Sequence, residues 1–210
     1  MALISIAHPD FRPQLLQHAI EERFVSRDLA YVEDRLQAGP PELRTTMLLE
    51  DGTQVFFRPI HPTDEPRMRE LFYALSQETL YYRFMARMKA IPRKQIQDFT
   101  YIDHRSEVAI VGTIPEAHGD ELIAIGRYYL DKTTNRAEVA FVVQDRWQGK
   151  GIGGVLYRHL ANIARRNGIA GFTAEVLAEN ARMQSVFNNS GHNVRTQLVE
   201  GVYHYDIDFE

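Results

Sequence analysis

The sequence contains no cysteine among its 210 residues. This absence excludes disulfide bonds, a thiol nucleophile and cysteine-based metal sites, and it suits a reducing compartment. The eight histidines do not have the mutual spacing of metal ligands, so we expect no metal.

Long apolar runs are also missing. No stretch approaches the ~20 apolar residues that a membrane span needs, and the N-terminus lacks the basic segment and apolar core of a signal peptide. The net charge of −4 does not indicate binding to nucleic acid, which a basic protein surface would favour. We therefore expect a cytoplasmic protein with neither a membrane nor a nucleic acid partner, in which any anion is bound at a local site.

Residues 1–50 are predicted to be a short strand–helix extension followed by a linker. They begin with a strand-like run, Leu3 to Ala7, and two helical segments follow. The clearest linker signal is Gly39-Pro40-Pro41. Because this piece is too short to bury a core alone, we predict a second domain over residues 51–210.

The second domain is predicted to be α+β. Its elements follow in the order strand, two or three helices, three strands, helix, strand, helix and two strands. Antiparallel strands come first, and one strand–helix–strand crossover comes later. This order favours a mixed, mostly antiparallel central sheet flanked by helices.

A glycine-rich turn follows the strand-like run Val139 to Val143. Four glycines lie within residues 149–154, and a segment with helical periodicity begins there. The first amides of a helix have no internal partner, and glycines let the backbone approach a phosphate closely, so this order predicts an anion site. Lys150 would add a mobile positive charge. The alternative is a turn that merely allows tight packing of the strand on the helix.

The common nucleotide motifs do not fit this turn. Lys150 is followed by glycine instead of serine or threonine, and the glycine spacing differs from GxGxxG. Gln148, Gly151 and Gly153 do match Gln-x-x-Gly-x-Gly, which resembles the acetyl-CoA pyrophosphate loop of the GNAT family of N-acetyltransferases. The element order over residues ~50–210 is similar to that family. The resemblance implies an N-acetyltransferase with acetyl-CoA as its co-substrate.

The resemblance also implies how acetyl-CoA is held. The loop amides would bind the pyrophosphate, and the strand backbone would pair with the pantetheine arm as an added strand does. The amide of Val142 or Val143 would donate to the oxyanion. Asn180 would contact the cofactor arm or simply cap the next helix. The residues assigned to acetyl-CoA are Phe141, Val142, Val143, Gln148, Gly149, Lys150, Gly151, Ile152, Gly153, Gly154 and Asn180.

Glu138 is the candidate general base. The acceptor amine must lose a proton, because a lysine titrates near pH ~10.4. Glu138 precedes an apolar strand run, and apolar surroundings tend to raise the pKa of a carboxyl group. The strings 137–143 and 76–84 resemble bacterial protein-lysine acetyltransferases that act on acyl-CoA synthetases, whose catalytic glutamate has the matching position. The alternative is an exposed carboxylate paired with Arg127 or Arg136.

Phe187 departs from the family pattern. Many members have a tyrosine in the helix after Asn180 to protonate the leaving thiolate, and phenylalanine cannot donate a proton. The thiolate would then leave unaided or take a proton from water.

Residues 3–12 are similar to the C-terminal end of the acetyl-CoA hydrolase/transferase family. This similarity implies that the chain is the tail of a larger fusion with a CoA-transferase domain. The alternative is an ordinary N-terminal strand and helix that pack on the main domain.

Three functions follow from these observations. The first is acetylation of a protein lysine, for example on an acyl-CoA synthetase, with Glu138 as base. The second is acetylation of a small-molecule amine. The third is a non-catalytic module that senses acetyl-CoA and regulates an attached CoA-transferase, which Phe187 and the N-terminal similarity favour.

Overall fold

The computed structural model describes residues 12–22, 43–88, 91–102, 106–116 and 119–209. The chain divides into two compact units, Met1–Gly39 and Pro40–Glu210. The described part of the first unit is the helix α2 (Arg12–Glu21) with one following residue. The expected strand at residues 3–7 and the CoA-transferase resemblance lie outside the described residues, so both stay predictions.

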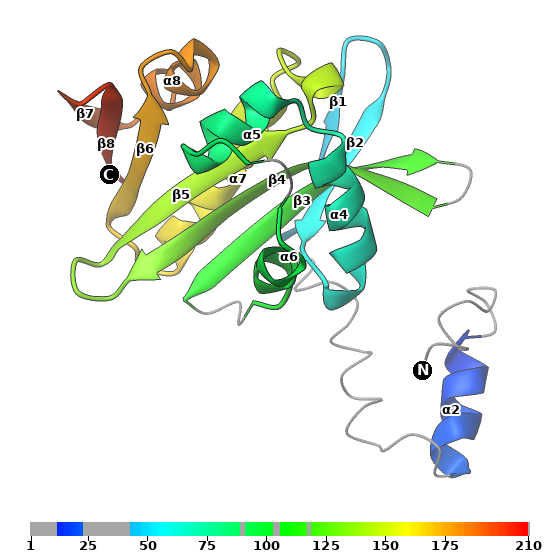
Figure 1. The fold of residues 1–210 in the computed structure, drawn as a ribbon. Coiled ribbons are helices and arrows are strands. Elements are labelled where there is room, and N and C mark those ends of the chain that lie inside the picture. The colour runs from blue at the N-terminus through cyan, green and yellow to red at the C-terminus, as the bar shows by residue number, and fades with distance from the viewer. Residues whose placement is uncertain (1–11, 23–42, 89–90, 103–105, 117–118, 210) are drawn as a thin grey trace. The chain divides into compact units, whose positions relative to one another are not determined.

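The second unit is built on one eight-stranded sheet with the order β1-β2-β3-β4-β5-β6-β8-β7. Only the β5–β6 pair is parallel, and the other neighbours are antiparallel. The predicted mixed, mostly antiparallel sheet is therefore confirmed (Figure 1). The strands are β1 (Thr45–Leu48), β2 (Gln54–Pro59), β3 (Glu107–Glu116), β4 (Gly119–Asp131), β5 (Arg136–Val143), β6 (Gly171–Leu177), β7 (Asn193–Val199) and β8 (Val202–Asp208).

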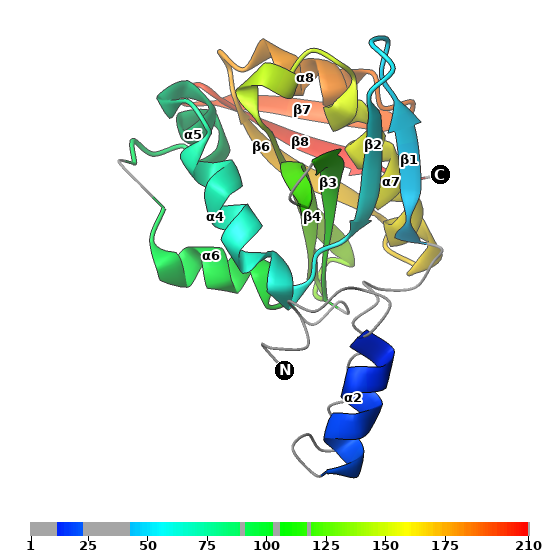
Figure 2. The ribbon, with the colours of Figure 1, turned by 90° about the vertical axis from the view of Figure 1, so that its right-hand side faces the viewer.

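Helices cover both faces of this sheet (Figure 2). Helices α4, α5 and α6 lie on one face, and α7 and α8 lie on the other. No helix among the described residues is long and apolar enough to cross a membrane. The helical segments are η3 (Pro62–Asp64), α4 (Glu65–Tyr73), α5 (Gln77–Phe84), α6 (Arg93–Thr100), η4 (Asp145–Trp147), α7 (Ile152–Arg166) and α8 (Ala181–Asn188).

Strand β5 divides its side chains between the two hydrophobic cores. Val139 and Phe141 pack in the cluster that contains α7, and Val142 packs in the cluster that contains α4 and α6. Successive side chains of a strand point to opposite faces, so a strand buried on both sides is apolar at nearly every position. This explains why the run 139–143 has no polar residue.

The sheet begins earlier than the expected domain start at residue 51. Strand β1 pairs with β2, with Thr45 opposite Phe57 and Leu48 opposite Gln54. Its four residues are too few to show periodicity, so the sequence pattern did not reveal the strand.

A buried ion pair joins β2 to the start of α4. The Asp64 carboxylate is 1% exposed and accepts hydrogen bonds from both terminal nitrogens of Arg58 at 2.6 and 2.8 Å, and from the His61 amide at 2.9 Å. Burial acts to raise the pKa of Asp64, but the bonds from Arg58 outweigh it and lower the pKa below its usual value. The pair therefore stabilises the fold only while the carboxylate is ionised.

Replacing Asp64 by Asn should lower the free energy of unfolding by about 3–5 kcal/mol, because a largely buried guanidinium loses its charge partner. The depressed folded pKa adds a pH dependence. The contribution of Asp64 is complete above its unfolded pKa and is lost as pH falls through the folded value. Urea unfolding at pH 7 and 3.5 should show that the free energy of unfolding falls more at the acid pH in the wild type than in Asp64→Asn. Equal losses would contradict this role, and Glu70→Gln on the exposed side of α4 is the control.

Candidate active site

A cleft opens where β5 and β6 separate. The two strands pair over only three positions, from Arg136 opposite Gly171 to Glu138 opposite Thr173, and then diverge (Figure 1). A cavity of about 1070 Å³ lies at the divergence, bounded by β5, α5, the glycine-rich turn and the start of α8. From Val139 onward, one edge of β5 therefore has no partner strand.

Backbone groups along this free edge alternate between β4 and the cleft. The Gln144 amide donates to Ile123 on β4 at 2.9 Å, whereas the Asn135 carbonyl accepts from Ala170, which leads into β6, at 2.9 Å. Because neighbouring residues of a strand direct their backbone groups to opposite sides, Phe141 and Val143 face the cleft and Val142 faces β4. Of the two amides expected to donate to the oxyanion, only that of Val143 faces the cleft.

The structure brings ten of the eleven residues assigned to acetyl-CoA to the wall of this cavity. Lys150 is the exception. Its ammonium lies 2.8 Å from the Asp51 carboxylate in the β1–β2 turn and 4.8 Å from the centroid of the Trp147 ring. The hydrogen bond from Lys150 lowers the pKa of Asp51. The expected mobile charge is thus paired, because the strand β1 that the sequence did not reveal brings Asp51 beside the turn.

The glycine-rich turn has the features of an anion site. Gly151 has a φ of 82°, in the left-handed region that glycine adopts without strain, and helix α7 begins at the next residue. No side chain caps the first amides of α7. Unpartnered amides at a helix N-terminus, beside glycines that line the cavity, suit the pyrophosphate of a CoA thioester.

Glu138 lies at the last position where β5 pairs with β6. Its side chain is exposed at the cleft, since the apolar neighbours of Glu138 alternate onto the opposite face. The alternative pairing with Arg127 or Arg136 is wrong. Arg127 pairs with Glu107, and Arg136 pairs with Asp208 at 2.9 Å. Among the described residues, no cation forms an ion pair with Glu138.

The charges around the cleft are mainly negative. Burial lowers the pKa of Arg83, and the Glu138 carboxylate opposes this shift, so the two groups influence one another across the cleft. Arg83 also lies 5.2 Å from the centroid of the Phe84 ring. The charged residues on the wall are Glu78, Arg83, Glu138, Glu175, Glu179 and Arg182.

Asp145 holds α5 against the glycine-rich turn, a role that no sequence pattern indicates. Its carboxylate accepts hydrogen bonds from the Ser76 amide at 2.9 Å, the Ser76 hydroxyl at 2.6 Å and the Thr79 hydroxyl at 2.7 Å. Burial acts to raise the pKa of Asp145, but the bonds from Ser76 and Thr79 outweigh it and lower the pKa. Ser76 and its acceptor Asp145 are 69 positions apart in the sequence, so no local pattern indicates this contact.

Gln148 links three walls of the cleft. Its side-chain amide donates to the Val143 carbonyl at 3.0 Å and to the Thr79 hydroxyl at 3.1 Å. Its oxygen accepts from Arg182 at 2.5 Å. The glutamine of the motif therefore connects β5, α5 and α8.

Asn180 and Phe187 lie on the α8 side. The Asn180 side chain accepts from the Met183 amide at 3.1 Å, so it is the N-cap of α8 and also lines the cavity. Phe187 is 1% exposed and packs 6.1 Å from the Phe141 ring. No hydroxyl is available at this position. Tyr82 on α5 also lines the cleft, and its hydroxyl donates to Glu78 at 3.0 Å.

Comparison with known proteins agrees with this geometry. The sequence model of the acetyltransferase (GNAT) family matches residues 67–191. An acetyltransferase of Pseudomonas aeruginosa is 30% identical over 138 residues, which cover 66% of this chain and 74% of that protein. Acetyltransferase Pat of Mycolicibacterium smegmatis is 31% identical over 157 residues, covering 72% of this chain and 43% of that protein.

Solved structures show the same fold. The GNAT domain of S. lividans PAT superposes with a TM-score of 0.73 at 32% identity, covering 81% of this chain and 99% of that chain. A variant of a cAMP-binding acyltransferase from Mycobacterium smegmatis gives a TM-score of 0.53 at 27% identity, covering 80% of this chain. The match covers only 48% of that acyltransferase, so this chain corresponds to one part of it.

Replacing Asp145 by Ala should lower the free energy of unfolding by about 1–2 kcal/mol, since three hydrogen bonds to one carboxylate are lost. It should also weaken acetyl-CoA binding, because α5 and the glycine-rich turn lose their common anchor. Urea unfolding and calorimetric titration measure the two effects. Asp145→Asn keeps one acceptor oxygen and should show smaller effects, and an unchanged Asp145→Ala protein would contradict the anchoring role.

Proposed function

Because the chain belongs to the acetyltransferase (GNAT) family, whose members transfer an acetyl group from acetyl-CoA to an amine, we propose that its acceptor is a lysine side chain on a protein. The observation that carries this proposal is the exposed Glu138 carboxylate at the point where β5 and β6 separate. It lies at one end of a cleft whose other end is formed by the glycine-rich turn.

The glycine-rich turn and the free edge of β5 are proposed to hold acetyl-CoA, which supplies the acetyl group as a thioester. The uncapped amides of α7 would bind the pyrophosphate. The backbone of Phe141 and Val143 would pair with the pantetheine arm. The Val143 amide would donate to the carbonyl oxygen as negative charge develops there. Asn180 would contact the arm while capping α8.

Glu138 is proposed to accept the proton of the lysine ammonium, directly or through one water. An exposed carboxylate without an ion-pair partner is able to take up a proton and release it to solvent. The buried Phe187 provides no proton for the leaving thiolate, so the thiolate would leave unaided or be protonated by water.

The character of the cleft favours a lysine over a neutral acceptor. Four carboxylates and two guanidinium groups line the wall, so the field attracts a cationic side chain. Several of these groups are exposed, including Glu78, Glu138 and Glu175, and the cleft is open to a side chain presented by a large partner. A closed pocket would have favoured a small-molecule amine. Because the sequence resembles lysine acetyltransferases that act on acyl-CoA synthetases, an acyl-CoA synthetase is the first acceptor to test.

Replacing Glu138 by Gln should lower kcat about 10²–10⁴-fold, as expected for loss of a general base. Acetyl-CoA should bind as tightly as before, because the glycine-rich turn is unchanged. The acceptor is first identified by mass spectrometry of acetylated lysines after incubation with acetyl-CoA and a bacterial lysate, and its acetylation is then timed with each variant.

Two outcomes would overturn the proposal. Unchanged acetylation by Glu138→Gln, with acetyl-CoA still bound, would remove Glu138 as the base. A wild-type protein that binds acetyl-CoA but acetylates nothing in the lysate and in an amine screen would instead be a regulatory module. Glu200→Gln, on the β7–β8 turn, is the matched control for the loss of one exposed carboxylate.

The phosphate site is tested separately at Gly154. A side chain there meets only the Arg158 guanidinium, at 3.4 Å from the added Cβ. Gly154→Asp should leave the fold at least as stable, because acidic residues favour the first turn of a helix. It should nevertheless weaken acetyl-CoA binding about tenfold or more by repelling the pyrophosphate. Gly154→Asn is the neutral control, and equal affinities of the two variants would contradict a phosphate site here.

A further inference from the structure

We propose that the protein substrate rests on the exposed face of β6, β8 and β7, and that its acceptor lysine is flanked by basic residues. This inference rests on the proposed function, since it assumes a protein acceptor. We call this surface the outer sheet face. It consists of Thr173, Glu175, Arg195, Gln197, His204 and Asp206.

The strand register joins the outer sheet face to the cleft. Directly paired residues of neighbouring strands point to the same side of a sheet. Glu138 pairs with Thr173, Thr173 with Asp206, and Asp206 with Arg195. One row of side chains therefore runs from the candidate base across three further strands.

A second row starts on the cleft wall itself. Glu175 lines the cavity and is paired with His204, which in turn is paired with Gln197. The side chains of Glu175 and His204 are 57% and 45% exposed. The outer sheet face is thus a continuation of the cleft wall that is open to solvent.

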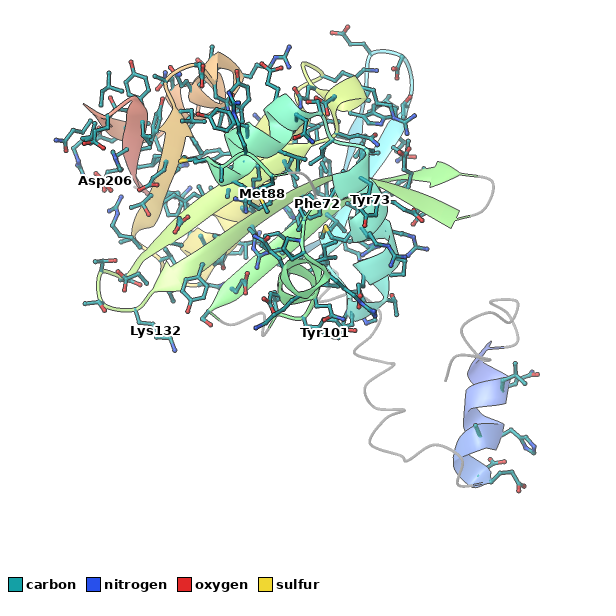
Figure 3. The ribbon with its side chains drawn as sticks, viewed as in Figure 1. Phe72, Tyr73, Met88, Tyr101, Lys132 and Asp206 are labelled. Carbon is teal, nitrogen blue, oxygen red and sulfur yellow. The ribbon has the colours of Figure 1, made fainter. Side chains whose placement is uncertain are left out.

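The two sides of these strands differ sharply. The opposite side carries Phe172, Ala174, Tyr205 and Ile207, which are all buried in the core with α7 and α8. On the outer side, α4, α5 and α6 lie over the part of the sheet around β3 and β4, away from β8 and β7 (Figure 1). Asp206 lies well apart from Phe72 on α4 (Figure 3). Within the described part of the chain, no helix covers the outer sheet face.

The charge that remains beside the cleft is negative. Asp206 is bonded by Arg195 at 2.7 Å, and Asp208 by Arg136 at 2.9 Å, so the far side of the face is neutralised. Among the described residues, Glu175 forms an ion pair only with His204, at 3.3 Å, and Glu138 forms none. A partner segment with basic residues matches this distribution.

The direction of approach follows from what surrounds Glu138. A lysine amine that reaches Glu138 brings its own backbone to the rim of the cleft. On the α5 side the cleft wall contains the half-buried Arg83, whose guanidinium lies 5.2 and 5.9 Å from the ring centroids of Phe84 and Phe99. On the β6 side the sheet is open. The residues next to the acceptor lysine therefore have room over Glu175 and the outer sheet face.

The test changes charge at Gln197, which is exposed and two strands away from the cleft. The substrates are three peptides with one lysine flanked by arginines, glutamines or glutamates, and N-acetyl-lysine amide as a small amine. Gln197→Lys should raise KM for the arginine-flanked peptide about two- to five-fold, the effect of one exposed charge pair, and Gln197→Glu should lower it by a similar factor. Both should leave KM for acetyl-CoA and for the small amine unchanged.

Two further variants sharpen the result. Glu175→Gln should raise KM for the arginine-flanked peptide more than for the glutamate-flanked one. Glu70→Lys, on the exposed side of α4, should change neither peptide. If the Gln197 variants treat all three peptides alike, the outer sheet face does not receive the substrate and the proposed function still stands. If neither the peptides nor the small amine are acetylated by wild-type protein that binds acetyl-CoA, the proposed function itself fails.

Discussion

The separation of β5 from β6 is the constraint on which the rest of the structure depends. A strand edge inside a sheet normally has every amide and carbonyl paired, but β5 loses its partner after three positions. The aromatic rings of Phe141, Tyr157 and Phe187 pack against one another in the core on the α7 side of the divergence. Gly126 leaves room for this packing, because a Cβ there would lie 2.7 Å from Phe141. The open edge is thus supported from below by the core.

The open edge also sets a distance between the two ends of the site. Glu138 and Val143 are five residues apart on an extended strand, which corresponds to about 17 Å. The glycine-rich turn follows Val143, so the proposed pyrophosphate site and the Glu138 carboxylate are kept apart by the length of one strand. A thin extended arm can bridge such a separation while it pairs with the strand. If acetyl-CoA binds as proposed, the fixed length of β5 would place its acetyl end at a set distance from the glycine-rich turn.

The parts predicted well from the sequence are those whose signals are local. A helical segment is predicted to begin within residues 149–154, and α7 starts at Ile152, since periodicity and glycine act within a few residues. The features that the sequence did not reveal depend on contacts between residues that are far apart in the chain. Asp145 meets Ser76 only in the folded chain, and Lys150 finds Asp51 through a four-residue strand that has no visible periodicity. The exposure of Glu138 depends on which part of its sheet face the helices α4, α5 and α6 leave uncovered, and no local pattern carries that information.

The three-pair junction between β5 and β6 has a mechanical consequence. It divides the sheet into two plates, β1 to β5 and β6 with β8 and β7, that share only a narrow seam. A small rotation about a seam at one end of a wedge produces a larger displacement at its open end. The mouth of the cleft, where the hydrogen bond from Arg182 to Gln148 crosses between the plates, is therefore the place where any flexing of the sheet is greatest. This hydrogen bond spans the mouth at the opposite end of the cleft from the seam, whose last residue pair contains Glu138.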